Sequence, residues 1–245
     1  MTDKWWRVTG AFGLGWFVLF AVGGIILQGE PPPFDQPVAE AREFFAGRGG
    51  RYLVGDYVAG LAFVLCFLPF IVGLRSLLGR AEGGLQIGSR LLLVAGVATI
   101  VIGDAATVFT DAIALAGGGP ELDDSTIHAL LDANAVAIAA IGLPMALFAF
   151  AASAVVWATG ALPRWLAVIG SVAGVLHLAG AAFPIEGEPD GVLFTLRFIG
   201  LIAFGLFVLL TSISMLATRN LAPVTSSRRP SVLKGESPGV TRRPA

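Results

Sequence analysis

The stretch LLLVAGVATIVIGDAATVFTDAIALA, residues 91–116, is almost wholly apolar but contains two carboxylates, Asp104 and Asp111. At about 1.5 Å per residue, a helix of this length is longer than the hydrocarbon core of a bilayer, which is roughly 30 Å thick. We therefore predict that residues 91–116 cross a membrane as a helix. Because charged groups are costly in hydrocarbon, the two carboxylates are expected to face a bundle interior or a polar cavity.

The composition of the whole chain points to the same class of protein. Of its 245 residues, 56% are hydrophobic and only 13% are charged, whereas a soluble domain has roughly 25% charged residues. The predicted fold is all-α: a polytopic membrane protein with a bundle of six transmembrane helices in one domain, residues 1–218. The six apolar runs, each long enough to cross, are Val8–Leu27, Tyr52–Leu74, Leu91–Ala116, Ile127–Ala158, Trp165–Phe183 and Val192–Ala217.

The basic residues predict the orientation of these spans. If the N-terminus is cytoplasmic, the cytoplasmic segments hold 12 of the 16 lysines and arginines, as the positive-inside rule requires. Both termini are therefore predicted to be cytoplasmic. Membrane lipids are the expected partners, the net charge of −1 gives no indication of a nucleic-acid partner, and an oligomer is not indicated. The twelve residues are Lys4, Arg7, Arg75, Arg80, Arg90, Arg164, Arg219, Arg228, Arg229, Lys234, Arg242 and Arg243.

Two segments are predicted to lie outside the bundle. In the exterior loop, residues 28–51, Asp35 could cap a short interfacial helix that has Pro37 in its first turn and ends at Gly47. The tail, residues 219–245, is rich in proline, serine and arginine, so we predict a disordered basic cytoplasmic tail. The fourth span is expected to begin with an N-cap at Asp124, Ser125 or Thr126 and to kink near Pro144.

This topology places every ionisable side chain within a span in the outer half of the membrane or at its midplane. Asp104 and Asp111 are seven residues apart, which is nearly two helical turns, so they share a face with Thr107 between them. His128 and Asp132 are four residues apart and also share a face. We therefore predict a polar pocket that faces the exterior and is closed on the cytoplasmic side by apolar packing. The candidate ligand-binding residues are Asp104, Asp111, Arg197, His177, Asp56, His128, Asp132 and Thr107.

Most of these residues also have a purely structural interpretation. Asp111 and Arg197, at matched depth, could form an ion pair, because intramembrane charges usually pair. Asp56 could lie in the interface, and His128 with Asp132 could be a hydrated pair at a helix start. His177 could bond to a backbone carbonyl.

No sequence motif identifies an enzyme class. His128, His177, Asp111 and Asp132 could surround a zinc ion, but their spacing does not require it, so no metal or other cofactor is assigned. The catalytic residues of any reaction are unknown.

Several segments resemble a known group of proteins. They are RVTGAFGLGWF at residues 7–17, FIVGLRSLLGRAEGG at 70–84 and GALPRWLAVIGSVAGVL at 160–176, with an exterior loop rich in proline and glutamate. They are similar to the uncharacterised bacterial six-span membrane proteins of the DUF4386 type, over most of residues 7–217. The resemblance implies a multi-pass protein of the bacterial plasma (inner) membrane and brings no activity or catalytic residues to this chain.

The sequence favours a protein that binds a small or lipidic molecule, and it leaves open whether the molecule is also transported or sensed. Asp104 and Asp111 would be its main polar groups, with Arg197 as their charge partner. One alternative is a membrane-embedded enzyme, with Asp104 as acid and His128 and His177 as base or metal ligands. Another is a structural or partner-binding subunit, whose polar residues only hold the fold together.

Overall fold

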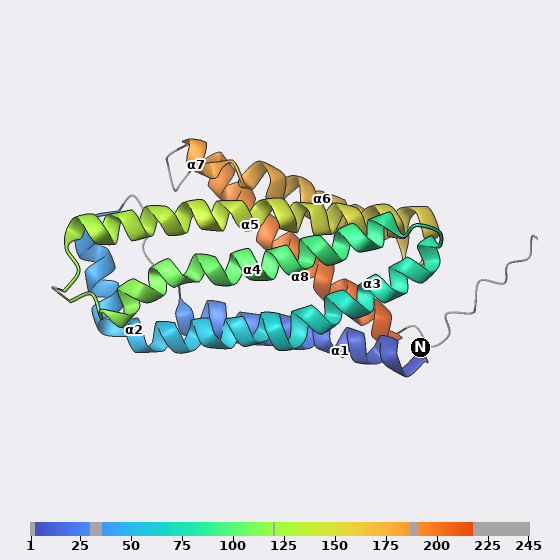
Figure 1. The fold of residues 1–245 in the computed structure, drawn as a ribbon, viewed down its shortest axis with the longest axis horizontal. Coiled ribbons are helices and arrows are strands. Elements are labelled where there is room, and N and C mark those ends of the chain that lie inside the picture. Colours follow the sequence, from blue (N-terminus) through green and yellow to red (C-terminus); the bar gives the residue numbers. More distant parts are fainter. Residues whose placement is uncertain (1–2, 30–35, 120, 187–190, 218–245) are drawn as a thin grey trace, which may run out of the picture.

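The computed structural model describes residues 3–29, 36–119, 121–186 and 191–217, and within these ranges every regular element is helical (Figure 1). The predicted tail, residues 219–245, lies outside the described residues, and so does Asp35. The elements are α1 (Asp3–Phe20), η1 (Ala21–Gln28), α2 (Val38–Leu61), η2 (Ala62–Phe67), α3 (Leu68–Glu82), α4 (Ile87–Leu115), α5 (Asp124–Thr159), α6 (Arg164–Gly180), α7 (Phe183–Glu186) and α8 (Val192–Ala217). The two η segments are π-helical and continue their neighbouring α-helices without a break.

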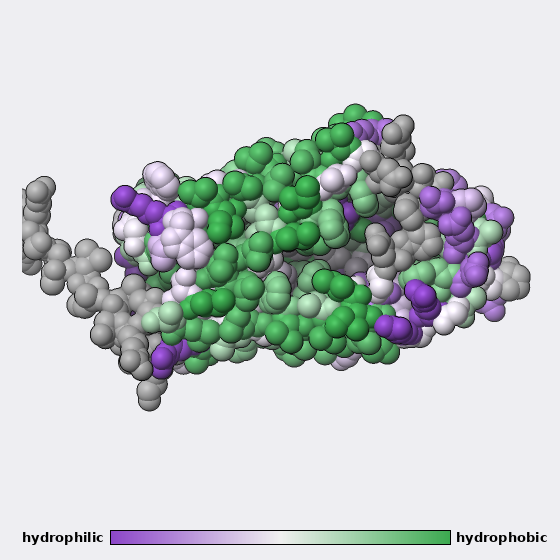
Figure 2. Space-filling view, turned by 180° about the vertical axis from the view of Figure 1, so that it is seen from behind, coloured by the Kyte–Doolittle hydropathy of each residue, from purple (hydrophilic) through white to green (hydrophobic). Residues whose placement is uncertain are grey.

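The predicted number of spans is confirmed. Six helices, counting α1 with η1 and α2 with α3, are long and apolar enough to cross a membrane. Large apolar side chains such as Ile25, Val101 and Leu178 are exposed on them, as expected where a helix faces lipid. Figure 2 shows a broad apolar band on the surface between two more hydrophilic ends. The chain thus has the build of an integral, multi-pass membrane protein.

The six spans form a closed ring. Each span packs against the next one in the sequence, and α8 returns to pack against α1. At the start of α1, a Cβ atom on Gly10 would lie 2.7 Å from the carbonyl oxygen of Ser212, near the end of α8. The described ends of the chain therefore meet at one end of the bundle, as an even number of spans requires.

Aromatic side chains fill the middle of this ring. Phe67, Phe148 and Phe204, from three different spans, are fully buried, and their ring centroids are 5.6–6.1 Å apart. Trp16 joins them at 4.9 Å from Phe67. Such offset and edge-to-face contacts are favourable for aromatic rings, so this cluster is the rigid centre of the bundle.

The second span is longer than predicted because the exterior loop contributes to it. The helix from Val38 runs on to Glu82, which is roughly 68 Å at 1.5 Å per residue and more than twice the thickness of the hydrocarbon core. The predicted helix end at Gly47 is wrong, since Gly47 lies inside α2. Figure 1 shows the first part of α2 lying across the end of the bundle. There Phe45 is buried in a second small core with Ile113 and Ile127.

Arg42 fastens this part of α2 to the connection between α4 and α5. Its guanidinium donates hydrogen bonds to the carbonyl oxygens of Gly118, Gly119 and Leu122, at 3.1, 2.6 and 2.5 Å. It also pairs with the Asp124 carboxylate at 2.7 Å. One planar cation thus satisfies three backbone carbonyls that lie outside the helices.

The fourth span also begins differently from the prediction. The N-cap of α5 is Asp123, whose carboxylate accepts a hydrogen bond of 2.7 Å from the backbone N–H of Thr126. This bond and one from the Ser125 hydroxyl hold the pKa of Asp123 below its ordinary value, because they stabilise the charged form. The helix then continues through Pro144 to Thr159 as one element.

We predict that Arg42→Ala lowers the free energy of unfolding by roughly 2–4 kcal/mol, because it leaves several carbonyls without a donor. Hydrogen exchange should rise over residues 113–124 in the same variant. The matched control is Arg48→Ala, which removes an exposed arginine 5.4 Å from the Phe44 ring and should cost no more than about 1 kcal/mol. Equal effects of the two variants would contradict the role given to Arg42.

Candidate functional site

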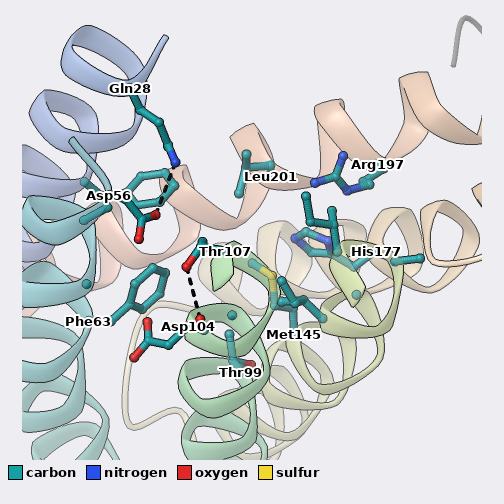
Figure 3. Close-up of a pocket in the computed structure, with 18 of the residues that line it drawn as sticks. Gln28, Asp56, Phe63, Thr99, Asp104, Thr107, Met145, His177, Arg197 and Leu201 are labelled. Carbon is teal, nitrogen blue, oxygen red and sulfur yellow. Dashed lines mark hydrogen bonds between the residues drawn. The ribbon is translucent and has the colours of Figure 1, made fainter. Parts of the chain in front are cut away.

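A pocket of about 180 Å³ lies between the helices, and every span contributes to its lining. Figure 3 shows Asp56, Thr107, His177 and Arg197 around a space bordered by Phe63, Met145 and Leu201. Apart from Thr99, the polar lining residues lie in the half of each span that is farther from the described ends of α1 and α8. The polar lining residues are Gln28 from η1, Asp56 from α2, Thr99, Asp104 and Thr107 from α4, His177 from α6 and Arg197 from α8.

One wall of the pocket is acidic. Asp56 on α2 accepts a hydrogen bond of 3.2 Å from the side-chain amide of Gln28. It lies near the side of α4 that carries Asp104 and Thr107. Thr107 also donates a hydrogen bond of 3.1 Å to the backbone carbonyl of Asp104. Asp104 itself is exposed, so it is free to meet a group inside the pocket.

Asp111 lies behind this wall and does not line the pocket. It is on the same face of α4 as Asp104, as predicted, and it lies near Asp56. Its Oδ1 atom is buried without a hydrogen-bond partner. The expected ion pair with Arg197 is absent from the described residues, whose salt bridges join Arg42 to Asp124 and His128 to Asp132. Asp111 is therefore adjacent to another acid and not to a cation.

The opposite wall is formed by Arg197 on α8 and His177 on α6. The guanidinium of Arg197 lies over the rings of Phe183 and Phe194, 5.5 and 5.8 Å from their centroids. His177 is only 3% exposed, and its Nε2 atom has no hydrogen-bond partner among the described residues. Figure 3 shows the two side chains next to each other, across the pocket from Asp56.

Glycines bring the helices of this second wall together. A Cβ atom on Gly180 of α6 would lie 2.5 Å from the Cα atom of Arg197, and one on Gly142 of α5 would lie 2.9 Å from the His177 carbonyl oxygen. A Cβ atom on Gly200 of α8 would lie 3.3 Å from the backbone nitrogen of His177. Small residues allow such close approach of helices in lipid, and here they fix both polar side chains at the pocket.

Both π-helical segments border the pocket. Gln28 is the last residue of η1, and Phe63 lies in η2. The widened turns of a π-helix shift the side chains that follow, and such segments are often found at functional sites. Proline contributes to the second one, because Pro69 lacks the N–H that would bond to the carbonyl of residue 65 in an α-helix.

His128 and Asp132 are not part of the site. They form an i,i+4 pair on α5, with Nδ1 and Oδ2 3.2 Å apart and more than half of each side chain exposed. Neither lines the pocket. The zinc arrangement considered from the sequence does not form, and no group of three His, Cys, Asp or Glu side chains in the described ranges could hold a metal ion. Since His128 does not line the pocket, the enzyme alternative keeps only His177 of its two proposed histidines.

Sequence reasoning missed two of the lining side chains that matter here. Gln28 follows directly on the last apolar residue of the first run, and a polar residue at that position usually marks the end of a span. Trp16 is 2% exposed, and its Nε1 atom has no partner. Nothing in the sequence separates this tryptophan from an ordinary core residue.

A comparison of the chain with protein families, curated proteins and solved structures finds no match. The resemblance to the DUF4386 type therefore stays a prediction.

We predict that Asp111→Asn leaves the melting temperature of the purified protein unchanged or raises it. The amide keeps hydrogen-bonding groups beside Asp56 while it removes one of two adjacent acids. Asp132→Asn, on the exposed pair, is the control and should have little effect. A melting temperature more than about 4 °C below that of the control variant would show that Asp111 has a cationic partner.

Proposed function

We propose that this protein binds a small polar or amphipathic molecule in the pocket between its six spans. The observation that carries the proposal is the separation of charge across the pocket. Carboxylates line one wall, while a guanidinium and a buried imidazole line the other, and no described residue joins the two. Ionisable groups within a span almost always face the bundle interior or a water-filled cavity, and they mark ligand or ion pathways.

The unpartnered polar atoms support a ligand more than a purely structural role. His177 Nε2 and Trp16 Nε1 are buried and lack hydrogen-bond partners in the described part of the chain, and both residues line the pocket. Leaving such a group unsatisfied costs about 1–3 kcal/mol. Buried polar groups in native proteins are nearly always satisfied by protein, water or a bound molecule. A residue kept only for packing would have no need of these atoms.

The size of the pocket limits the ligand. Its volume of about 180 Å³ is below the roughly 300–1,000 Å³ of pockets that enclose drug-sized molecules. The ligand is therefore a small molecule, or a larger amphipathic one that places only its polar end inside. The aromatic centre of Trp16, Phe67 and Phe204 closes the pocket from the end of the bundle where the described chain ends meet.

The distribution of basic residues supports a pocket that opens to the exterior. Arg80 near the end of α3, Arg90 near the start of α4 and Arg164 at the start of α6 lie at the same end of the bundle as the start of α1. The positive-inside rule assigns that end to the cytoplasm. The pocket lies in the other half, which would make it accessible from outside the cell or from the outer leaflet.

The proposal is tested by thiol labelling at Gly103, which lines the pocket and has no atom within 4 Å of a Cβ placed on it. Gly103→Cys, made in a Cys66→Ser background, is expected to react with a water-soluble, membrane-impermeant methanethiosulfonate added to the outside of intact cells. The control is Val101→Cys, two residues away on the same helix and 61% exposed, which should not react because it faces lipid.

Labelling of both cysteines, or of neither, would contradict a water-filled pocket at this position. Labelling of Gly103→Cys only from the cytoplasmic side would contradict the proposed orientation.

A further inference from the structure

We propose that Arg197 and His177 form an anion-binding subsite, so that the molecule bound in the pocket carries a carboxylate or phosphate group. The inference rests on the proposed function, since it assumes that the pocket admits a molecule. It adds the chemical class of that molecule and the position of its charged end.

The first support is the state of the Arg197 side chain. A guanidinium has five N–H donors in a fixed plane, and none of them is bonded to another residue in the described ranges. The rings of Phe183 and Phe194 lie against the guanidinium plane. They offer no hydrogen-bond acceptor to its N–H groups. No carboxylate of the described residues lies within 4 Å of it. Arginine in this condition is suited to bind a carboxylate or phosphate through two parallel hydrogen bonds.

The second support is the buried imidazole beside it. His177 is 3% exposed and its Nε2 atom is unpartnered, yet the residue lines the pocket. Its ring is held edge-on against Phe204, with centroids 5.7 Å apart, so its position is set by the aromatic centre. A ligand oxygen held by Arg197 would offer this nitrogen a hydrogen-bond partner.

The third support is that the backbone is shaped to place these two side chains. The contact of Gly180 with the Arg197 backbone leaves no room for a side chain, and the contact of Gly200 with the His177 backbone is tighter than an ordinary one. The close approach at Gly180 holds the backbones of α6 and α8 together at the point where Arg197 and His177 reach the pocket. The acidic wall of Asp56 and Asp104 lies across the pocket and repels a second negative charge, so an anionic group is expected at the Arg197 wall only.

The test measures how fast Gly103→Cys, in the Cys66→Ser background, reacts with a neutral water-soluble maleimide in purified full-length protein. Acetate, inorganic phosphate and glycerol 3-phosphate are added as probes at constant ionic strength. At least one of these anions is expected to slow the reaction. Arg197→Gln should weaken this protection by about tenfold or more, as expected for a lost charge-assisted hydrogen bond, when the rate with the anion is divided by the rate of the same variant without it.

A second arm distinguishes a soluble anion from a lipid headgroup. The same rate is measured in nanodiscs of phosphatidylcholine with and without phosphatidylglycerol. Protection by the anionic lipid alone identifies the outer-leaflet headgroup as the source of the anion, and protection by the soluble probes identifies a solute. In either case the protection must depend on Arg197.

Three controls keep the result interpretable. Arg48→Gln, at an exposed arginine, should bind as the parent protein does. Arg197→Lys, which keeps the charge but loses the fork of donors, should bind with intermediate affinity and replaces Arg197→Gln if that variant does not fold. Glu188 and Asp190 lie outside the described residues, so a variant with Glu188→Gln and Asp190→Asn is tested as well and should be unchanged.

The outcomes separate this inference from the proposed function. If Gly103→Cys does not react even without an anion, the pocket itself is closed and the proposed function fails. If it reacts but no anion slows it, or if Arg197→Gln is protected as well as the parent, only the anion subsite is overturned. Tighter anion binding after Glu188 and Asp190 are neutralised would show that the chain's own carboxylates fill the site, and would overturn it too.

Discussion

The high cost of an unpaired charge in hydrocarbon is the constraint on which this structure depends. A helix that crosses the membrane can keep Asp56, Asp104 or Arg197 only if the bundle turns that side chain away from lipid. The closed ring of six spans provides an interior where this is possible. Within that interior the acids of α2 and α4 lie on one wall and the cation of α8 on the other, and the described residues leave them apart. A fold that used these charges only for cohesion would have joined them.

The bundle is built in two halves with different packing. In one half Phe67, Phe148 and Phe204 meet across the centre and leave no space. In the other half, the turns around η1 and η2 and the close helix contacts at Gly180 and Gly200 leave a cavity with polar walls. His177 is positioned by its contact with Phe204 of the aromatic centre, whereas Arg197 is positioned by Phe183 and Phe194. The cavity is thus supported by the packing next to it.

Much of the fold follows from the sequence because hydrocarbon imposes a simple rule on the length and polarity of a span. The six apolar runs and the shared face of Asp104 and Asp111 could both be predicted from this rule. The partners across the bundle do not follow, since they depend on how each helix is rotated about its axis. The pair of Asp111 with Arg197 was predicted from their matched depth in the membrane. In the structure, the rotation of α4 about its axis places Asp111 near Asp56 instead. The position of the first part of α2 was also hidden, because it is fastened by contacts of Arg42 with carbonyls more than 70 residues away.

The most direct test of this account is a cryo-electron microscopy structure of the full chain in lipid nanodiscs, at a resolution that shows ordered water. The account predicts non-protein density, from water or a bound molecule, in the cavity between Asp56 and Arg197, with the two side chains on opposite walls. A map in which the Arg197 side chain crosses to pair with Asp56 or Asp111, with no density or space between them, would contradict it.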